Sequence, residues 1–397
     1  MWLLPALLLG QFALCELSIT FPNATDGNEL VRIHDYYQPS PLVDSVANLG
    51  IHAVIDLLSS HPNVIISPLN IFSCLDILEL GAAGATKEEI DNIVGHAKSD
   101  NTLGKILKTL HGTTHASAVF FNQELVPKAE FIQESYSKHQ TEILNLDFSD
   151  GAQATSAINS WVFYKTNGTI QEILDQNVDA NAKVVVVNAL TFNGKWLHPF
   201  SPYVTETGRF DIDDQHFVNI PLMHLEAYLP VIRRTTYDAV GLPYQEENLV
   251  MYVILPNNQG LEELKKVLYS FSPTDLKGFT SSAIPQMASI VLPKFKLTAR
   301  FSMKEALAKQ GMNTSFNPEL GNFTNFLENE ADDVYISDIY HSVHFEVNEH
   351  ETIASAASAA IFTKSRTFQF KVTRPFIFVI ADKSGLLLFM GVVNKPE

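Results

Sequence analysis

Residues 349–376 read EHETIASAASAAIFTKSRTFQFKVTRPF, and this stretch decides how the chain is interpreted. A short charged run leads into a tract of small side chains. Two basic residues, Lys364 and Arg366, follow, and then comes the alternating pattern of Phe368–Val372. Alanine and serine in such number usually indicate a helix. Here, however, the tract lies between two segments with strand character.

Small side chains between strands suit a segment that must slide between other strands without clashing. Thr352, Ala354, Ala356, Ser358, Ala360 and Phe362 would share one face of such a strand, and five of the six are small. No charge lies between Thr352 and Thr363, so insertion would bury none. The basic residues that follow suit a trypsin-like protease. The pattern favours a protease inhibitor that works by changing shape, and a helix or a flexible linker is the structural alternative.

The composition predicts one large folded domain. Of the 397 residues, 46% are hydrophobic and 18% are charged, which excludes a disordered chain. The formal net charge of -17 argues against nucleic acid and polyanions as partners. We interpret Lys98, Lys105 and Lys108 as a solvated helix face, so heparin binding is not expected.

The N-terminus predicts secretion. Residues 1–15, MWLLPALLLGQFALC, are apolar and uncharged, too short to span a bilayer comfortably, and end in a small-x-small pattern. We therefore expect a signal peptide at 1–15, a polar extension at 16–41, and a single domain at 42–397. No second apolar run is long enough to cross a membrane, so an extracellular protein without membrane insertion is expected. N-glycosylation sequons occur at Asn23, Asn167, Asn313 and Asn322.

The residue patterns predict an α+β fold. Helical periodicity runs from about Leu42 to Ile90 and breaks at Pro62, and Ile71–Leu80 is apolar nearly all round. Val184–Leu190 and Leu249–Leu255 are continuous apolar runs, typical of strands buried on both faces. The remaining strands are expected at Ile290–Leu297, at Phe368–Val372, and in a hairpin over Phe376–Ile380 and Leu386–Val393.

The motifs of common enzyme and cofactor classes are missing from the sequence. It holds no G-x-G-x-x-G, Walker loop, H-E-x-x-H, C-x-x-C or G-x-S-x-G pattern. Ser67, His341 and Asp338 could form a triad on paper, and His341 with His344 could form a metal pair. Both readings are weak without geometry. Cys74, which remains after signal cleavage, is expected to be a buried, inert thiol. The sequence therefore predicts no enzyme, no catalytic residue, no cofactor and no metal site.

Several segments in a fixed order resemble the serpin family from about Leu42 to Pro396. The segments are Asn63–Pro68, Leu80–Ala82, Thr86–Ile90, Ile158–Val162, Thr166–Ile170, Val187–Ala189, Phe192–Trp196, Leu242–Tyr244, Leu292–Phe295, Phe345–Glu349 and Arg374–Phe376. Each motif alone is weak, but their order is specific.

The resemblance implies about nine helices around three β-sheets, with an exposed reactive loop at about 349–370. In inhibitory members the protease cleaves this loop and becomes trapped as an acyl-enzyme when the loop inserts into the central sheet. The expected partner is thus a trypsin-like serine protease in a covalent complex with a monomeric inhibitor. The implied hinge consists of Glu349, Glu351, Thr352, Ala354, Ser355, Ala356, Ala357 and Ser358.

The position of the cleaved bond stays open. The order of preference is Lys364–Ser365, then Arg366–Thr367, then Ser365–Arg366. The resemblance also implies a cluster that gates the opening of the sheet, formed by Ser67, Asn70, Asn188 and His341. Ordinary core polar residues are the alternative reading for these four.

The chain departs from the family pattern at two of these positions, and the first departure, Glu351, keeps a second function open. Glu351 replaces the glycine that the family usually places two residues after the hinge glutamate, so it restricts the backbone and adds a charge at the insertion point. Asn70 stands where many members carry serine. The alternative function is a non-inhibitory serpin that carries a ligand or binds a partner.

Overall fold

The computed structural model describes residues 41–95, 103, 106, 112–245, 248–329, 334–349 and 367–396. They belong to one compact unit that runs from Pro39 to the end of the chain. The expected signal peptide, the N-terminal extension up to residue 40 and the whole small-residue tract lie outside the described residues.

Eight α-helices are described, and their ends follow local sequence rules. In α2 the Ser67 side chain caps the N-terminus by accepting a hydrogen bond from the Asn70 backbone N–H, and Pro68 occupies the first turn. Almost every residue of α2 is buried, as its all-round apolar sequence predicted. The helices are α1 Pro41–Leu57, α2 Pro68–Gly81, α3 Gly84–Val94, α5 Ala129–His139, α6 Gly151–Lys165, α7 Leu261–Tyr269, α8 Pro273–Ser281 and α9 Lys304–Lys309, with short 3-10 turns η2 Pro202–Val204, η3 Thr314–Phe316 and η4 Thr324–Phe326.

The strands form a nine-stranded and a five-stranded sheet among the described residues. In the larger sheet the order is β1-β14-β13-β8-β7-β6-β9-β12, with β5 paired to β6, and in the smaller it is β10-β11-β4-β2-β3. The strands are β1 Val64–Ile66, β2 Thr113–Asn122, β3 Glu142–Leu146, β4 Val184–Phe192, β5 Glu206–Asp211, β6 Phe217–Arg233, β7 Tyr237–Pro243, β8 Leu249–Pro256, β9 Ile284–Pro293, β10 Phe295–Ser302, β11 Ile336–Val347, β12 Phe368–Lys371, β13 Phe376–Asp382 and β14 Leu387–Val393.

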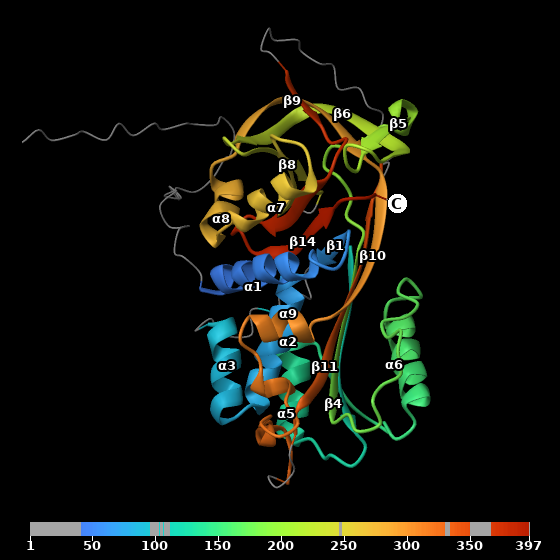
Figure 1. Cartoon of the computed structure of the whole chain (residues 1–397), viewed down its shortest axis with the longest axis vertical. Coiled ribbons are helices and arrows are strands. Elements are labelled where there is room, and N and C mark those ends of the chain that lie inside the picture. The colour runs from blue at the N-terminus through green and yellow to red at the C-terminus, as the bar shows by residue number, and fades with distance from the viewer. Residues whose placement is uncertain are drawn as a thin grey trace, which may run out of the picture. The chain divides into compact units, whose positions relative to one another are not determined.

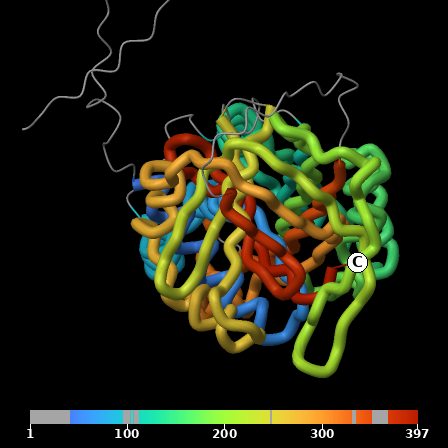
Figure 2. The backbone as a smooth tube through the Cα atoms, turned by 90° about the horizontal axis from the view of Figure 1, so that it is seen from above, coloured from blue at the N-terminus to red at the C-terminus, as the bar shows by residue number. Residues whose placement is uncertain are grey.

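One long strand explains why three expected sheets correspond to two hydrogen-bonded ones. The first part of β6 pairs with β5, its middle with β9, and its last residues with β7. The β5, β9 and β12 group is therefore continuous with the group that runs from β7 to β1. Figure 2 shows the hairpin of β5 and β6 in light green, extending away from the neighbouring strands.

The five-stranded sheet lies between two layers of helices, with α6 on one side and α2, α5 and α9 on the other (Figure 1). Strand β4 contributes to the core on both faces. Its Val184 and Val186 belong to the main core, whereas Val185 and Val187 pack in a separate core with Ile158 of α6. The strand buried on both faces, predicted from the valine run, is confirmed.

The predicted strand Ile290–Leu297 is wrong. The chain breaks it at Lys294, so that β9 ends at Pro293 in the larger sheet and β10 begins at Phe295 in the smaller one. Proline has no N–H to continue a ladder, and the Lys294 N–H bonds to the Pro221 carbonyl instead. The residue alternation continues across this point, so periodicity alone gave no sign of the change of sheet.

Stacked aromatic rings join the two sheets. Phe345 of β11 is fully buried and stacks on Phe378 of β13, with ring centroids 5.2 Å apart, and on Phe192 of β4 at 5.9 Å. Rings in such contact add to the burial of their apolar area. The end of β11 is thereby fixed against the larger sheet.

Replacing this central ring should destabilise the fold strongly. We expect Phe345→Ala to lower the free energy of unfolding by about 3–5 kcal/mol, because it removes a buried ring and leaves a cavity. Phe163→Ala is the control, since the Phe163 side chain is 46% exposed on α6. Urea-induced unfolding followed by fluorescence measures both, and equal stability losses would contradict the packing described.

Candidate functional site

The central feature of the smaller sheet is the parallel pair of β4 and β11. The two strands pair from Val184 to Phe192, with one irregularity between Ile336 and Asp338 of β11. His341 of β11 lies directly opposite Asn188 of β4. Beyond its last residue, β11 leads to Glu349, the first residue of the charged run that precedes the small-residue tract. The chain re-enters the described part at residue 367 and forms β12, which pairs with β9 in the other sheet. The tract thus connects a central strand of one sheet to a terminal strand of the other.

The four residues expected as a gating cluster lie together beneath this strand pair. The backbone N–H of Ser67 donates to Nε2 of His341 at 3.0 Å. The Asn70 Nδ2 donates to Oδ1 of Asn188 at 3.3 Å, and the Asn188 Nδ2 donates to the Asn70 carbonyl at 3.3 Å. Each of the two strands is therefore bonded to the start of α2, and all four residues are buried.

This bonding pattern has a chemical consequence for His341. Since Nε2 accepts a hydrogen bond from a backbone N–H, the ring is neutral, with its proton on Nδ1. Burial, reinforced by the nearby His115, lowers the pKa of His341 to about 3. The imidazole is therefore a neutral structural group at ordinary pH. It accepts a hydrogen bond and carries no charge.

The thiol of Cys74 belongs to the same polar layer. Asn188 Nδ2 lies 3.2 Å from its Sγ, so one amide side chain contacts both α2 residues, Asn70 and Cys74. Burial raises the pKa of Cys74 to about 11, more than the hydrogen bonds from Asn188 and Ser117 lower it. A thiol that stays protonated is a poor nucleophile, in agreement with the expectation of an inert cysteine.

A second group of contacts holds the start of the tract. Glu349 is only 12% exposed at its side chain; its Oε1 accepts from Thr205 Oγ1 at 2.9 Å, and its Oε2 pairs with Lys294 Nζ at 2.8 Å. Burial alone would raise the pKa of Glu349, but the bonds from Lys294, from its own backbone and from Thr205 outweigh it and hold the pKa below its ordinary value. Beside it, Trp196 Nε1 donates to the Asn348 carbonyl at 2.9 Å. The tract therefore leaves the sheet from an anchored residue.

The sequence did not indicate these partners of Glu349. Lys294 and Trp196 occur in the motifs quoted for the family resemblance, but nothing in their spacing connects them to residue 349. Lys294 faces Glu349 because it stands at the crossing from β9 to β10, which the predicted strand Ile290–Leu297 missed. Thr205 follows the short turn η2 and carries no sequence signal.

The other predicted site residues fall into two groups. From the hinge, Glu351, Thr352, Ala354, Ser355, Ala356, Ala357 and Ser358 lie outside the described residues, as do Lys364, Ser365, Arg366 and the sequon at Asn23. The sequons at Asn167, Asn313 and Asn322 are described, and each asparagine is exposed.

The structure does not assemble the triad considered on paper. Both Asp338 oxygens accept from Ser302 Oγ at 2.8 Å, whereas His341 faces Ser67. His344 bonds to Thr298 Oγ1 at 2.8 Å, so it does not pair with His341 around a metal. Across the described ranges, no group of three or more histidine, cysteine, aspartate and glutamate side chains is arranged to hold a metal ion.

Comparison with known proteins agrees with this geometry. The sequence profile of the family described as "Serpin (serine protease inhibitor)" matches residues 45–396. Glia-derived nexin of Mus musculus is 32% identical over 391 residues, covering 92% of this chain and 96% of the relative. Plasminogen activator inhibitor 1 of Mus musculus is 29% identical and covers 85% and 88%, respectively.

Two solved structures are similar to this one. The "native protease nexin-1 with heparin" structure covers 90% of this chain and all of its own, with a TM-score of 0.81 and 28% identity. Uncleaved ovalbumin covers 89% of this chain with a TM-score of 0.82, and at 23% identity it shows the fold alone.

These findings correct one expectation. The sequence predicted only that the chain is no enzyme. The comparisons replace this with a positive description, because the matched family is described as serine protease inhibitors and a relative carries an inhibitor name. The family profile spans most of the sequence, and a relative that is 32% identical covers 92% of it. The chain therefore belongs to the serpin family.

Proposed function

We propose that this protein inhibits a trypsin-like serine protease by offering the tract after Glu349 as a substrate and then inserting it between β4 and β11. The observation that carries this proposal is the placement of the tract. It begins directly beyond β11, one of the two strands between which it would insert, and it starts from the anchored residue Glu349. A cut on the far side of the tract would free one end while leaving the other in position.

The chemistry of the tract supports insertion. Its alternate residues Thr352, Ala354, Ala356 and Ser358 are small, so they would fit beneath the sheet without displacing α2. A new strand would also gain ladder hydrogen bonds on both sides. The stabilisation of the inserted form is the driving force for trapping the protease.

We place the cleaved bond at Lys364–Ser365 first, and at Arg366–Thr367 or Ser365–Arg366 after it. The protease serine would attack the Lys364 carbonyl, the peptide bond to Ser365 would break, and the amine of Ser365 would leave with a proton. The carbonyl of Lys364 would then be esterified to the protease. Either basic residue suits the acidic specificity pocket of a trypsin-like enzyme.

The buried network beneath the sheet is proposed as the gate. Separating β4 from β11 would pull His341 from Ser67 or Asn188 from Asn70, because each strand is tied to α2. Each such hydrogen bond is worth about 1 kcal/mol net. These bonds keep the boundary between β4 and β11, called the seam below, closed in the intact protein. The hydrogen bonds gained by an inserted strand can outweigh those lost when the seam opens.

We further propose a secreted protein with a signal peptide at 1–15, an extension at 16–41 and one domain from 42. Exposure of Asn167, Asn313 and Asn322 is compatible with N-glycans at these sequons. Among the described residues, no helix is long and apolar enough to cross a membrane.

The exclusion of heparin-type ligands does not stand. A structural neighbour at 28% identity was crystallised with heparin, and the basic stretch at Lys98, Lys105 and Lys108 lies outside the described residues. Net charge describes the whole chain, and a local cluster of cations can bind a polyanion despite it.

A non-inhibitory carrier or partner-binding serpin is the second candidate, and Glu351 is the residue that favours it. Its charge would have to leave water at the start of insertion. If Glu351→Gly inhibits trypsin and the natural chain does not, the carrier function is favoured over inhibition.

Inhibition predicts a covalent complex with trypsin that survives denaturing electrophoresis, and a higher melting temperature after cleavage of the tract. Ala356→Arg should abolish the complex and turn the protein into a substrate, since a charge would be buried on insertion. Ala357→Arg, on the opposite face of the strand, is the matched control and should retain more of the complex. A complex formed equally by both variants would contradict the insertion proposal.

The buried His341 predicts a pH-dependent stability of the gate. Its pKa is lowered in the folded protein from 6.5 to about 3, so the unfolded chain binds the extra proton first, and stability should fall as the pH falls below 6.5. Between pH 6.5 and 5 we expect a loss of about 1–2 kcal/mol from this group. His341→Gln keeps an acceptor for Ser67 but cannot titrate, so its urea midpoint should depend less on pH. Parallel pH profiles for both proteins would contradict this role.

A further inference from the structure

The smaller sheet has an open edge at β10, separate from the seam between β4 and β11. Strand β10 pairs with β11 on one side, and it is the first strand in the order of this sheet among the described residues. Just beyond the strand, the Met303 N–H donates to the Ile339 carbonyl of β11. Because N–H groups alternate sides along an antiparallel strand, those of Lys296, Thr298 and Arg300 point away from β11.

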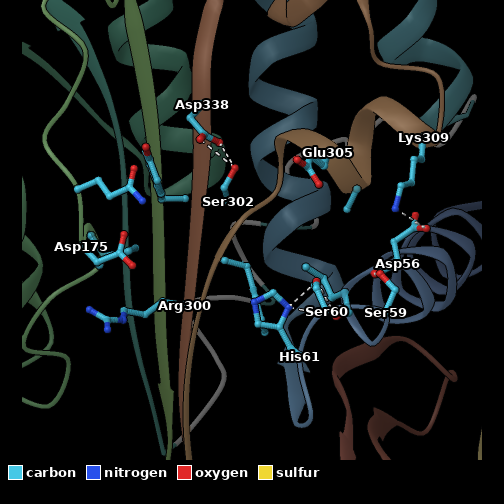
Figure 3. A pocket seen from close by; sticks show the side chains of 16 residues that line it. Asp56, Ser59, Ser60, His61, Asp175, Arg300, Ser302, Glu305, Lys309 and Asp338 are labelled. Atoms are coloured by element: carbon cyan, nitrogen blue, oxygen red, sulfur yellow. Dashed lines mark hydrogen bonds and ion pairs between the residues drawn. The ribbon is translucent and has the colours of Figure 1, made fainter.

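A groove lies in front of this edge. Two adjoining cavities of about 390 and 320 Å³ share His61, Asp175, Arg300 and Phe301 in their walls. Figure 3 shows Asp175 and Arg300 on one side of the sheet and His61 with Ser60 on the other, so the cavity straddles the sheet edge. Residues of β10 line both cavities, which places the outward N–H groups along the groove.

The two ends of the groove differ in charge. Near Ser302, four carboxylates line it: Asp56, Asp175, Glu305 and Asp338. The two cations at this end are already engaged, Lys309 with Asp56 at 3.5 Å and Arg300 with Glu172 at 3.4 Å. At the opposite end, Lys296 is the charged residue that the second cavity adds to the shared Asp175 and Arg300. A ligand that lies along the groove is therefore favoured when its positive end is at Ser302.

We propose that the β10 edge is a docking site for an extended segment of a partner protein, which adds as a sixth strand with basic residues at the Ser302 end. N–H groups at every second residue need carbonyls at strand spacing, and another strand supplies them. A partner is favoured over a second copy because two chains of net charge -17 repel each other. This docking is independent of the reactive tract and of the inhibition proposed above.

The test uses the full chain and a labelled peptide, acetyl-Lys-Val-Arg-Val-Thr-Val-Glu-amide, in fluorescence anisotropy. In an antiparallel arrangement its cations lie at the Ser302 end and its carboxylate near Lys296. A control peptide with all charges reversed should bind at least tenfold more weakly. Residue-resolved hydrogen exchange should show added protection at the amides of Lys296, Thr298 and Arg300.

A matched pair of variants isolates the strand hydrogen bonds. Thr298→Pro removes one outward N–H, which an edge strand tolerates, while Thr298→Val keeps it. Both lose the hydroxyl that bonds to His344, so this loss cancels in the comparison. We expect Thr298→Pro to weaken peptide binding about tenfold and Thr298→Val to leave it within about twofold. Equal binding by the two variants would overturn the proposal.

A second variant keeps the test valid if the proline variant fails to fold. Asp175→Asn with Glu305→Gln changes two exposed side chains and should weaken binding about fivefold at low salt. Protection at Tyr340 and Ser342 instead of β10 would place the peptide in the seam and refute edge docking. Self-association of the chain without peptide binding would assign the edge to a second copy and refute it equally.

Discussion

The intact fold depends on keeping β4 and β11 side by side over a polar layer. Two parallel strands buried on both faces could be held by apolar packing alone, and much of this pair is. At its centre, however, His341 and Asn188 bond to the start of α2. Hydrogen bonds in a buried site are directional and stabilise one arrangement specifically. An apolar layer would tolerate sliding, whereas this layer is satisfied only when both strands occupy their closed positions.

In the insertion mechanism proposed above, the same layer would restrain the entry of a new strand. Opening the pair exposes a histidine, two asparagines and a serine that must find other partners, because unpaired buried polar groups are costly. Glu349 adds to the order at one end, since its carboxylate is held by Thr205 and Lys294. The arrangement of the strand pair is thus defined by a few named contacts at the middle and at the end of β11, and the inserted strand proposed above would have to accommodate both sets.

The sequence predicted the elements better than it predicted the contacts between them. The valine run of β4 and the apolar α2 were clear because their burial on all sides leaves a continuous hydrophobic pattern. The crossing at Lys294 was missed because alternation continues from one sheet into the next. Ser67, Asn188 and His341 are far apart in the chain, and only the family resemblance placed them in one cluster. The partners of Glu349 depend on tertiary folding and had no local signal.

The seam and the β10 edge pose the same physical problem in one sheet, and the fold treats them differently. At the seam, each side of a new strand would meet a neighbour, so the full gain of two ladders is available and side chains beneath the sheet must restrain it. At β10 a new strand would gain one ladder only. Hydrogen bonds to a helix beneath the sheet, like those from α2 at the seam, are therefore not needed to restrain it. The edge carries charges instead, with Arg300 and Lys296 on the strand and carboxylates around it.

Charged edges discourage indiscriminate strand pairing, and an uneven distribution of charge along the edge still permits a strand of complementary charge to pair. Restraint by hydrogen bonds at the seam and selection by charge at the edge therefore follow from how many ladders each position offers.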